Sequence, residues 1–193
     1  MPTKSSYHHG DLRRALLDGA VAEVAAHGVG AFSLSALARA CNVSTAAPYR
    51  HFADREALFA EVAIEGYGRL ATRLEARAAG ARGPEGVVLA MGDAYLDFAQ
   101  AEPGYFAVMF GGVVEKDRYP DVRVAGDATL GALVAAVGAI GGTPGDALSF
   151  WALAHGFAIL AREGLWRETP GAPPIAEAMR TAGRAQLVGI GRR

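Results

Sequence analysis

The sequence is poor in cysteine and contains no long apolar run, and both features limit what the protein can be. Cys41 is the single cysteine among 193 residues, so the chain can form no internal disulfide and lacks the paired cysteines of common metal sites. No uncharged apolar stretch reaches the roughly 20 residues that a membrane-spanning helix needs, and the first residues are polar, unlike a secretory leader. We therefore expect a cytoplasmic protein with no membrane segment, no metal site and no cofactor.

Signals for β-strands and for catalysis are also scarce. The sequence contains no nucleophile elbow, P-loop, zinc-protease motif or cysteine–histidine pair, and its carboxylates fall mostly on helix faces expected to be solvated. An enzyme is therefore not expected, although turnover of a bound ligand would reopen that possibility. Apolar residues make up 51% of the chain and charged residues 20%, which is typical of a globular protein with a buried core. Their helical spacing throughout favours an all-α fold.

Charge is nearly balanced overall but differs between the two ends of the chain. The net charge of −1 argues against a protein that coats nucleic acid without specificity. Residues 1–52 carry five Lys and Arg against three Asp and Glu, whereas residues 53–193 carry fourteen against seventeen. This small N-terminal excess of positive charge fits specific DNA contact at one end of the chain.

Residues 32–52, FSLSALARACNVSTAAPYRHF, predict two short helices joined by a tight turn. One apolar face has the spacing i, i+3, i+4, i+7 and is expected to be buried: Leu34, Leu37, Ala38 and Cys41. Ser33 is positioned to cap the first helix, since its hydroxyl can accept a hydrogen bond from a first-turn amide. Asn42 would supply the turn, because asparagine tolerates the left-handed backbone conformation.

The second of these helices has a surface suited to DNA. Ser44 or Thr45 would cap it, and Pro48 would fall in or just after its first turn, where a missing N–H costs little. A helix, a turn and a short capped helix form the helix-turn-helix plan, whose second helix enters the major groove. Small side chains there allow close approach to base edges: Thr45, Ala46, Ala47 and Pro48. Polar ones that follow can reach phosphates: Tyr49, Arg50 and His51. An ordinary helical hairpin with a polar rim is the alternative.

The rest of the chain predicts about nine helices in total. A helix from residue 11 to about His27, ended by Gly28, would complete a three-helix head. Asp54 would cap a long helix that runs to about residue 79 and ends before the break at 80–84. Further helices are expected over 85–101, 120–140, 144–164 and 174–188, with an aromatic segment at 105–110 and loops at 113–121 and 165–174. We therefore predict a DNA-binding domain at 1–53 and a ligand-binding and dimerisation domain at 54–193, joined as a head and a helical bundle.

The first ten residues are expected to form a short arm. Lys4 and Tyr7 are candidates for contact with phosphate or a neighbouring minor groove. His8 and His9 are adjacent imidazoles without further ligands nearby, which makes a poor metal site.

The N-terminal sixty residues resemble the TetR family of bacterial transcriptional repressors. The stretches that match are YHHGDLRRALLDGA, FSLSALARACNVS and STAAPYRHFADREALF, in that order, and the most specific part is YRHF at 49–52 followed by a charged residue at 55. Trp151-Ala-Leu-Ala-His155-Gly156 further resembles the tryptophan–histidine–glycine signature of one C-terminal subgroup. The resemblance implies an all-helical homodimer with an N-terminal DNA-reading head and a C-terminal domain for ligand binding and dimerisation.

By matching position, the resemblance also implies which residues touch DNA. Phosphate contacts would fall at Ser33, Tyr49, His51 and Arg55. Base-edge or methyl contacts would fall at Thr45, Ala46, Ala47 and Pro48, with Arg50 able to make either kind and Ser44 added at the start of the second helix. Two positions depart from the commonest pattern, Asn42 for glycine and Arg55 for lysine, and both substitutes are physically serviceable.

Aromatic and sulfur-containing side chains in the later helices are candidates for either a hydrophobic core or an effector cavity. A core position is the simpler interpretation for most of them. A small-molecule site is apolar with a few polar groups, and the candidates for it are Met91, Tyr95, Phe98, Phe106, Met109, Phe110, Trp151 and His155. Tyr95, Trp151 and His155 are preferred because each carries a polar group. We expect His155 to be neutral and hydrogen-bonded, either to a ligand or, as the simpler interpretation, in a buried bond between helices.

The function expected from these observations is that of a ligand-responsive transcriptional regulator. In this interpretation a homodimer, formed through 144–163 and 174–188, holds its two recognition helices about 34–36 Å apart on an operator. A small apolar or aromatic effector would release it from that double-stranded DNA. Activation in place of repression stays open, because the sign depends on where the operator lies. A helical adaptor that binds other proteins is the alternative from a different class.

Overall fold

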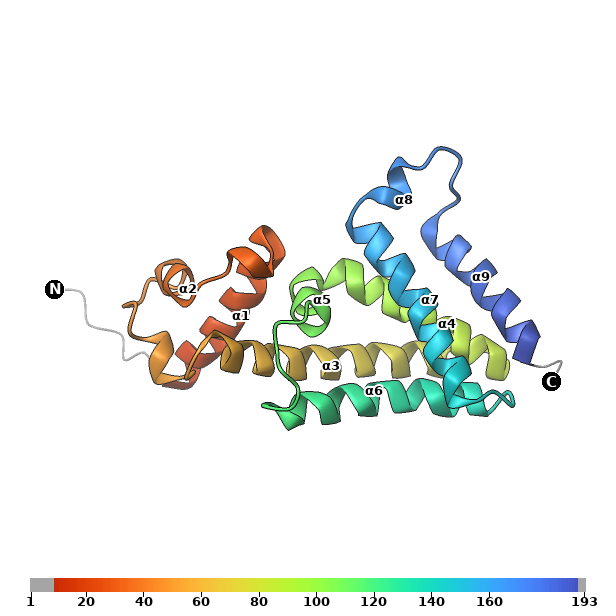
Figure 1. Ribbon diagram of the computed structural model, residues 1–193, viewed down its shortest axis with the longest axis horizontal. Helices are drawn as coiled ribbons and strands as arrows, with labels where there is room; N and C mark the ends of the chain where they lie inside the picture. Colours follow the sequence, from red (N-terminus) through yellow and green to blue (C-terminus); the bar gives the residue numbers. More distant parts are fainter. Residues whose placement is uncertain (1–8, 191–193) are drawn as a thin grey trace. The chain divides into compact units, whose positions relative to one another are not determined.

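The computed structural model describes residues 9–190, with side chains from residue 12, and every regular element in that range is helical (Figure 1). The described residues form nine α-helices and two 3₁₀ helices: α1 (His9–His27), η1 (Val29–Ala31), α2 (Leu34–Ala40), η2 (Pro48–Arg50), α3 (Arg55–Ala79), α4 (Gly83–Ala101), α5 (Pro103–Phe110), α6 (Pro120–Gly138), α7 (Pro144–Arg162), α8 (Leu165–Glu168) and α9 (Ile175–Ile190). The predicted all-α fold and helix number are confirmed. Lys4, Tyr7, His8 and the side chain of His9 lie outside the described residues.

Three segments differ from the elements that the sequence predicted. The second helix of the helix-turn-helix is only a 3₁₀ turn, η2, because Pro48 has no N–H to donate to the Ser44 carbonyl. The chain closes instead through shorter rings, in which the Ala47 amide donates to Ser44 at 2.9 Å and the Arg50 amide to Ala47 at 3.1 Å. The aromatic segment at 105–110 is helical, as α5, and begins at Pro103, where no N–H is needed. The expected loop at 165–174 contains the short helix α8.

The chain divides into two compact units. The first unit consists of residues 1–66 and 104–123, and the second unit consists of residues 67–103 and 124–193. The helix α3 crosses from the first unit into the second between Gly66 and Tyr67. Among residues 9–190, no helix is both long and apolar enough to cross a membrane.

In the first unit, apolar faces of α1, α2 and the start of α3 form the core. The most deeply buried side chains are Leu16, Leu37, Ala38, Leu58 and Phe59. Phe32, just before α2, packs its ring on that of Phe59, with 4.8 Å between the centroids. Cys41 was expected to be buried with this face but is half-buried, because α2 ends before it and Cys41 becomes the C-terminal cap.

A charged network joins three helices of the first unit. Arg14 of α1 donates from Nη1 to Oε2 of Glu65 on α3 at 2.6 Å, and it also pairs with Asp18. The Tyr105 hydroxyl on α5 donates to the other oxygen of Glu65 at 2.7 Å. Hydrogen bonds to Asp18, Glu65 and Tyr105 raise the pKa of Arg14. The network fixes the rotation of α1 and α5 against the first half of α3.

In the second unit, α4, α7 and α9 pack against one another. The fully or almost fully buried side chains of these helices include Val88, Leu96, Phe98, Phe150 and Met179. Asp93 on α4 is only 7% exposed, and Arg180 of α9 meets it with Nε 2.9 Å from both carboxylate oxygens and Nη2 2.7 Å from Oδ2. A buried carboxylate without such a partner would be strongly destabilising, so this pair fixes which faces of α4 and α9 meet.

Gly104 allows α5 to approach α1 within backbone contact. A Cβ atom at residue 104 would overlap the carbonyl oxygen of Val21 and lie 2.9 Å from its Cγ1. Because the obstacle is backbone, no change of rotamer relieves the clash. We predict that Gly104→Ala lowers the free energy of unfolding by about 1–3 kcal/mol, measured by chemical denaturation.

Gly68 on α3 is the matched control for this experiment. It also lies within a helix, but a Cβ there would meet nothing within 4 Å. Gly68→Ala should leave stability unchanged or raise it by up to ~1 kcal/mol, because alanine loses less conformational entropy in a helix. Equal effects of the two substitutions would contradict the close approach of α5 and α1.

Candidate nucleic-acid interface and effector pocket

The helix α2 begins and ends with two local motifs that position the following segment. The Ser33 hydroxyl accepts a hydrogen bond from the Ala36 amide at 3.1 Å, as its capping role predicted. Asn42 has a φ of 55°, which confirms the left-handed turn. The Val43 amide donates to Ala38 at 2.9 Å and the Asn42 amide to Arg39 at 3.0 Å, the pairing of a Schellman motif. These bonds determine the direction in which the chain leaves α2.

We call residues 44–52 the reading segment, because they carry most of the predicted DNA contacts. Ser44, Thr45 and Ala46 are exposed, Ala47 is half-buried, and Pro48 is buried, so the proline ring packs on the first unit. Beyond Pro48, the Tyr49 side chain is 56% exposed, Arg50 is exposed and His51 is half-buried. The segment therefore presents small side chains followed by hydrogen-bonding ones.

Phe52 and the start of α3 hold the end of the reading segment. Phe52 is 2% exposed, and the Arg13 guanidinium of α1 lies over its ring at 5.4 Å from the centroid. Arg55 is exposed and lies 5.4 Å from the Phe59 ring centroid, which leaves its guanidinium edge open to solvent. Ser33 is exposed as well. All the phosphate-contact candidates thus have solvent-accessible side chains, with His51 the least exposed.

A second set of polar contacts joins the start of α3 to the segment before α6. The Asp54 carboxylate caps α3, with Oδ1 accepting from the Ala57 amide at 2.8 Å. Arg118 donates from Nη2 to Oδ2 of Asp54 at 2.7 Å and from Nη1 to Oε2 of Glu56 at 2.8 Å. The Glu115 amide donates to the other oxygen of Glu56 at 2.7 Å. We call these four contacts of Asp54, Glu56, Glu115 and Arg118 the α3 clasp.

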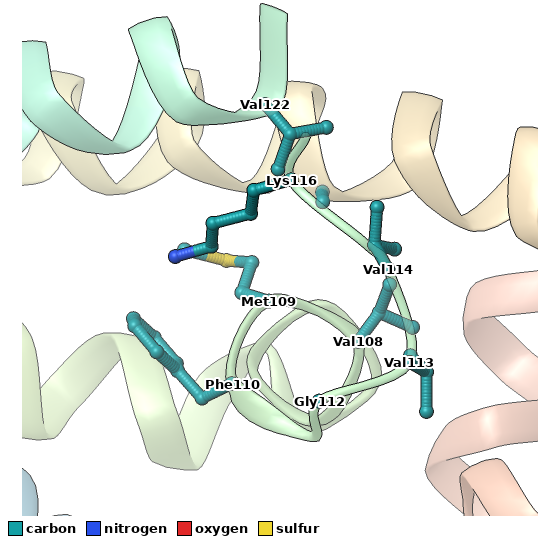
Figure 2. Close-up of a pocket in the computed structure, with 9 residues that line it drawn as sticks. Val108, Met109, Phe110, Gly112, Val113, Val114, Lys116 and Val122 are labelled. Atoms are coloured by element: carbon teal, nitrogen blue, oxygen red, sulfur yellow. The ribbon is translucent and has the colours of Figure 1, made fainter. Parts of the chain in front are cut away.

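Beside the clasp lies a small open pocket within the first unit (Figure 2). Its volume is about 180 Å³, and its lining comes from α3, α5, the start of α6 and the segment between α5 and α6: Ala63, Val108, Met109, Phe110, Gly112, Val113, Val114, Lys116 and Val122. Lys116 and Met109 extend to the side where Phe110 lies, and Val113 and Val114 lie on the opposite side. The side chains that line the pocket are therefore apolar except for that of Lys116.

Hydrogen bonds link the three preferred ligand candidates of the second unit through the Tyr95 hydroxyl. The Tyr95 hydroxyl of α4 lies 2.7 Å from Nδ1 of His155 on α7, and the Trp151 indole, which can only donate, hydrogen-bonds the same hydroxyl. The hydroxyl proton therefore points to Nδ1, which leaves the His155 proton on Nε2. Burial, followed by the charge of Arg162, lowers the pKa of His155, so the imidazole is neutral near pH 7. The expected interhelical bond of a neutral His155 is confirmed.

The remaining ligand candidates fall in different units. Met91 and Phe98 are buried and lie in the second unit, as do Tyr95, Trp151 and His155. Phe106, Met109 and Phe110 belong to the first unit, where the rings of Phe106 and Phe110 lie 4.9 Å apart and Met109 lines the pocket. The sequence missed Val113, Val114 and Lys116, which lie in a segment predicted to be only a charged loop. A signal was present there, since two adjacent valines interrupt otherwise polar residues.

Two family models match different parts of the chain. Residues 16–62 match the family model described as bacterial regulatory proteins, tetR family, and residues 88–182 match the model described as tetracyclin repressor-like, C-terminal domain. The chain belongs to the TetR family. TetR proteins are regulators of transcription that bind DNA through the helix-turn-helix, and this chain carries that element in residues 33–52.

Individual relatives and solved structures are also similar to this chain. The uncharacterised HTH-type transcriptional regulator YobS of Bacillus subtilis (strain 168) is 32% identical over 96 residues, a match that covers 49% of this chain and spans half the length of that curated relative. A Rhodococcus sp. RHA1 protein of unknown function is 33% identical with a TM-score of 0.79, covering 97% of this chain and 100% of its own. The TetR regulator PfmR of Thermus thermophilus, at 18% identity and a TM-score of 0.69 over 90% of this chain and 97% of its own, shares the fold.

The α3 clasp makes stability depend on the ionisation of Asp54. The Ala57 amide, followed by Arg118, lowers the pKa of Asp54. A lowered folded-state pKa stabilises the protein above the ordinary aspartate range and loses that effect as the pH falls through the folded-state value. We predict that Asp54→Ala costs about 1 kcal/mol at pH 7 by loss of the cap, and that Asp54→Asn costs less.

Arg118→Ala allows the stabilisation from the Asp54–Arg118 ion pair to be measured apart from that of the helix cap. The stability difference between the wild type and Asp54→Asn should shrink as the pH falls below about 4, in denaturation curves recorded at several pH values. In the background of Arg118→Ala, Asp54→Asn should cost less than in the wild type, because the pair is already lost. Additive effects of the two substitutions would show that the pair contributes nothing.

Proposed function

We propose that this protein is a homodimeric transcriptional repressor that leaves its operator when a small apolar or aromatic effector binds. The observation that carries the proposal is the exposed reading segment, which the Asn42 turn and the buried Phe52 hold at its two ends. In this proposal, residues 1–53 bind DNA, and residues 54–193 bind the effector and form the dimer. DNA binding assigns the site of action to the bacterial cytoplasm, and no catalytic activity is part of the proposal.

The reading segment would contact DNA with two kinds of side chain. Thr45, Ala46 and Ala47 are small enough for backbone and methyl groups to approach base edges, including thymine methyls. Arg50 can contact a guanine edge or a phosphate, and the Tyr49 side chain, at 56% exposed, can reach a phosphate. Ser33, Ser44, His51 and Arg55 would bind phosphates and so set the position of the segment on the duplex. Pro48, being buried, would support the segment from behind.

Dimer formation is proposed through α7 and α9. These helices pack together and still expose large apolar side chains, with Leu148 on α7 at 47% and Val188 on α9 at 48%. Exposed apolar side chains on two adjacent helices favour a protein partner, and a second copy is the partner that a two-fold operator requires. The two recognition elements would then lie about 34–36 Å apart on one face of the DNA.

Binding to the DNA upstream of its own gene tests the reading segment. At about 150 mM salt, the wild type should bind this duplex with nanomolar affinity and a scrambled duplex much more weakly. We predict that Arg50→Ala weakens operator binding by about 5-fold to 150-fold, because one base or phosphate contact contributes about 1–3 kcal/mol. Fluorescence anisotropy measures both affinities.

Arg82→Ala is the matched control, since it removes the same exposed charge from the N-terminal end of α4. It should leave operator affinity unchanged. Tyr49→Ala should weaken binding as Arg50→Ala does while the thermal transition stays the same. If Arg50→Ala and Arg82→Ala lower operator affinity equally, binding depends only on net charge, which would contradict specific recognition by the reading segment. If Tyr49→Ala binds normally, the reading segment is not the interface.

The dimer interface is tested by placing a charge on it. We predict that Leu148→Glu shifts the protein from dimer to monomer in sedimentation at micromolar concentration, because an unpaired carboxylate would have to be desolvated at the interface. Val124→Glu places the same charge at an exposed apolar position of α6 and should leave the dimer intact. A wild-type monomer under these conditions would contradict the proposed geometry.

A further inference from the structure

The pocket of the first unit has one distinctive chemical feature, which is Lys116. Its other lining residues bring only apolar surface and backbone, and no carboxylate lines it. The chain has only two lysines, Lys4 and Lys116, although its Lys and Arg total is 19. Within residues 12–190, Lys116 takes part in no ion pair, whereas the neighbouring Asp117 pairs with Arg123. An apolar pocket with one unpaired ammonium group at its edge matches an amphipathic anion.

The size of the pocket limits what such an anion can be. At about 180 Å³ it is smaller than the roughly 300–1,000 Å³ of sites for drug-sized ligands. It is close to the ~150 Å³ of a dry apolar cavity that accepts benzene. A single ring or a short branched hydrocarbon therefore fits among Val108, Met109 and Val122, with a charged group left at the opening. Lys116 is exposed, so that group stays partly hydrated when paired.

We propose that this pocket is the effector site and that it binds a small apolar monocarboxylate of about the size of benzoate, whose carboxylate pairs with Lys116. The proposal rests on the proposed function, since it names the effector class and the site of a ligand-responsive repressor. The hydrocarbon part supplies most of the binding free energy through burial, and the ammonium group selects acids over neutral molecules of the same shape.

The α3 clasp connects the pocket to the reading segment. Gly112, Val113, Val114 and Lys116 line the pocket, and in the same segment the Glu115 amide and the Arg118 side chain bind Glu56 and Asp54. Asp54 follows Phe52, the buried end of the reading segment, by two residues. A ligand that displaces residues 112–116 would therefore disturb the α3 clasp, whose Asp54 lies next to the end of the reading segment. Operator affinity then changes by the ratio of the ligand affinities for the clasped and unclasped states.

The scarcity of lysine provides a direct measurement of the site. Reductive ¹³C-methylation labels only Lys4, Lys116 and the N-terminal amine and keeps their positive charge, and Lys4→Arg assigns the Lys116 signal. We expect the NMR signal of Lys116 to shift saturably when sodium benzoate is added to the DNA-free protein. Benzamide, the neutral molecule of nearly the same shape, should bind at least about threefold more weakly, as an exposed charge pair allows.

Substitution of Lys116 completes this test. Lys116→Gln should weaken benzoate binding, measured by calorimetry, at least about threefold and leave benzamide binding unchanged. Because Lys116 is exposed and unpaired, the variant should fold as the wild type does. No saturable shift of the Lys116 signal with up to about 10 mM benzoate would overturn the proposed site. Equal affinities for benzoate and benzamide would overturn the proposed ligand class.

Operator binding with and without benzoate separates this proposal from the proposed function. Benzoate should weaken operator binding of the wild type at least about fivefold, whereas Arg118→Ala should bind benzoate normally and respond less. If the protein binds its operator specifically but the Lys116 NMR signal does not shift with benzoate, the effector site is overturned and the proposed function stands. A saturable Lys116 shift in a protein that distinguishes no operator overturns the proposed function and supports the pocket. Benzoate binding that leaves wild-type operator affinity unchanged overturns the coupling through the clasp.

Discussion

Glu65 accepts hydrogen bonds from two helices at once, and the arrangement of the first unit depends on that carboxylate. Arg14 comes from the helix that supports the helix-turn-helix, and Tyr105 comes from the helix that forms one wall of the pocket. Neutralising Glu65 would leave a guanidinium and a hydroxyl without their common acceptor. One side chain in the middle of α3 therefore keeps the DNA-reading elements and the pocket wall in a fixed relation.

At the beginning of the same helix, the α3 clasp also uses one carboxylate for two structural contacts. Asp54 uses one carboxylate oxygen to cap α3 and the other to bind Arg118. The same side chain therefore helps to start the helix and to hold residues 112–118 against it. In the proposed mechanism, an effector in the pocket of the first unit needs no path through the second unit to reach the reading segment. The second unit would then contribute the proposed dimer interface, and its Trp151–Tyr95–His155 hydrogen bonds join α4 to α7.

The features that the sequence predicted well are local ones. The caps formed by Ser33 and Asp54 and the turn at Asn42 each involve residues within four positions, so residue type and spacing were enough to assign them. Pro48 was placed in the right turn, but its missing N–H was expected to cost little, whereas the segment forms only a 3₁₀ turn. The ligand candidates were grouped by chemistry alone. Sequence could not divide them between two units or add Lys116, because both depend on which distant helices meet.

The first unit is discontinuous in sequence, since residues 104–123 return to residues 1–66 after the chain has made α4. During synthesis, Glu65 and Asp54 leave the ribosome before their partners Tyr105 and Arg118 have been translated. The DNA-reading part therefore completes its packing late, through contacts of long sequence separation, which slow folding. A recombinant swap of residues 1–53 between regulators would replace Arg14 but not Glu65 or Tyr105. Such chimaeras should succeed only when the exchanged α1 brings a cation to that position.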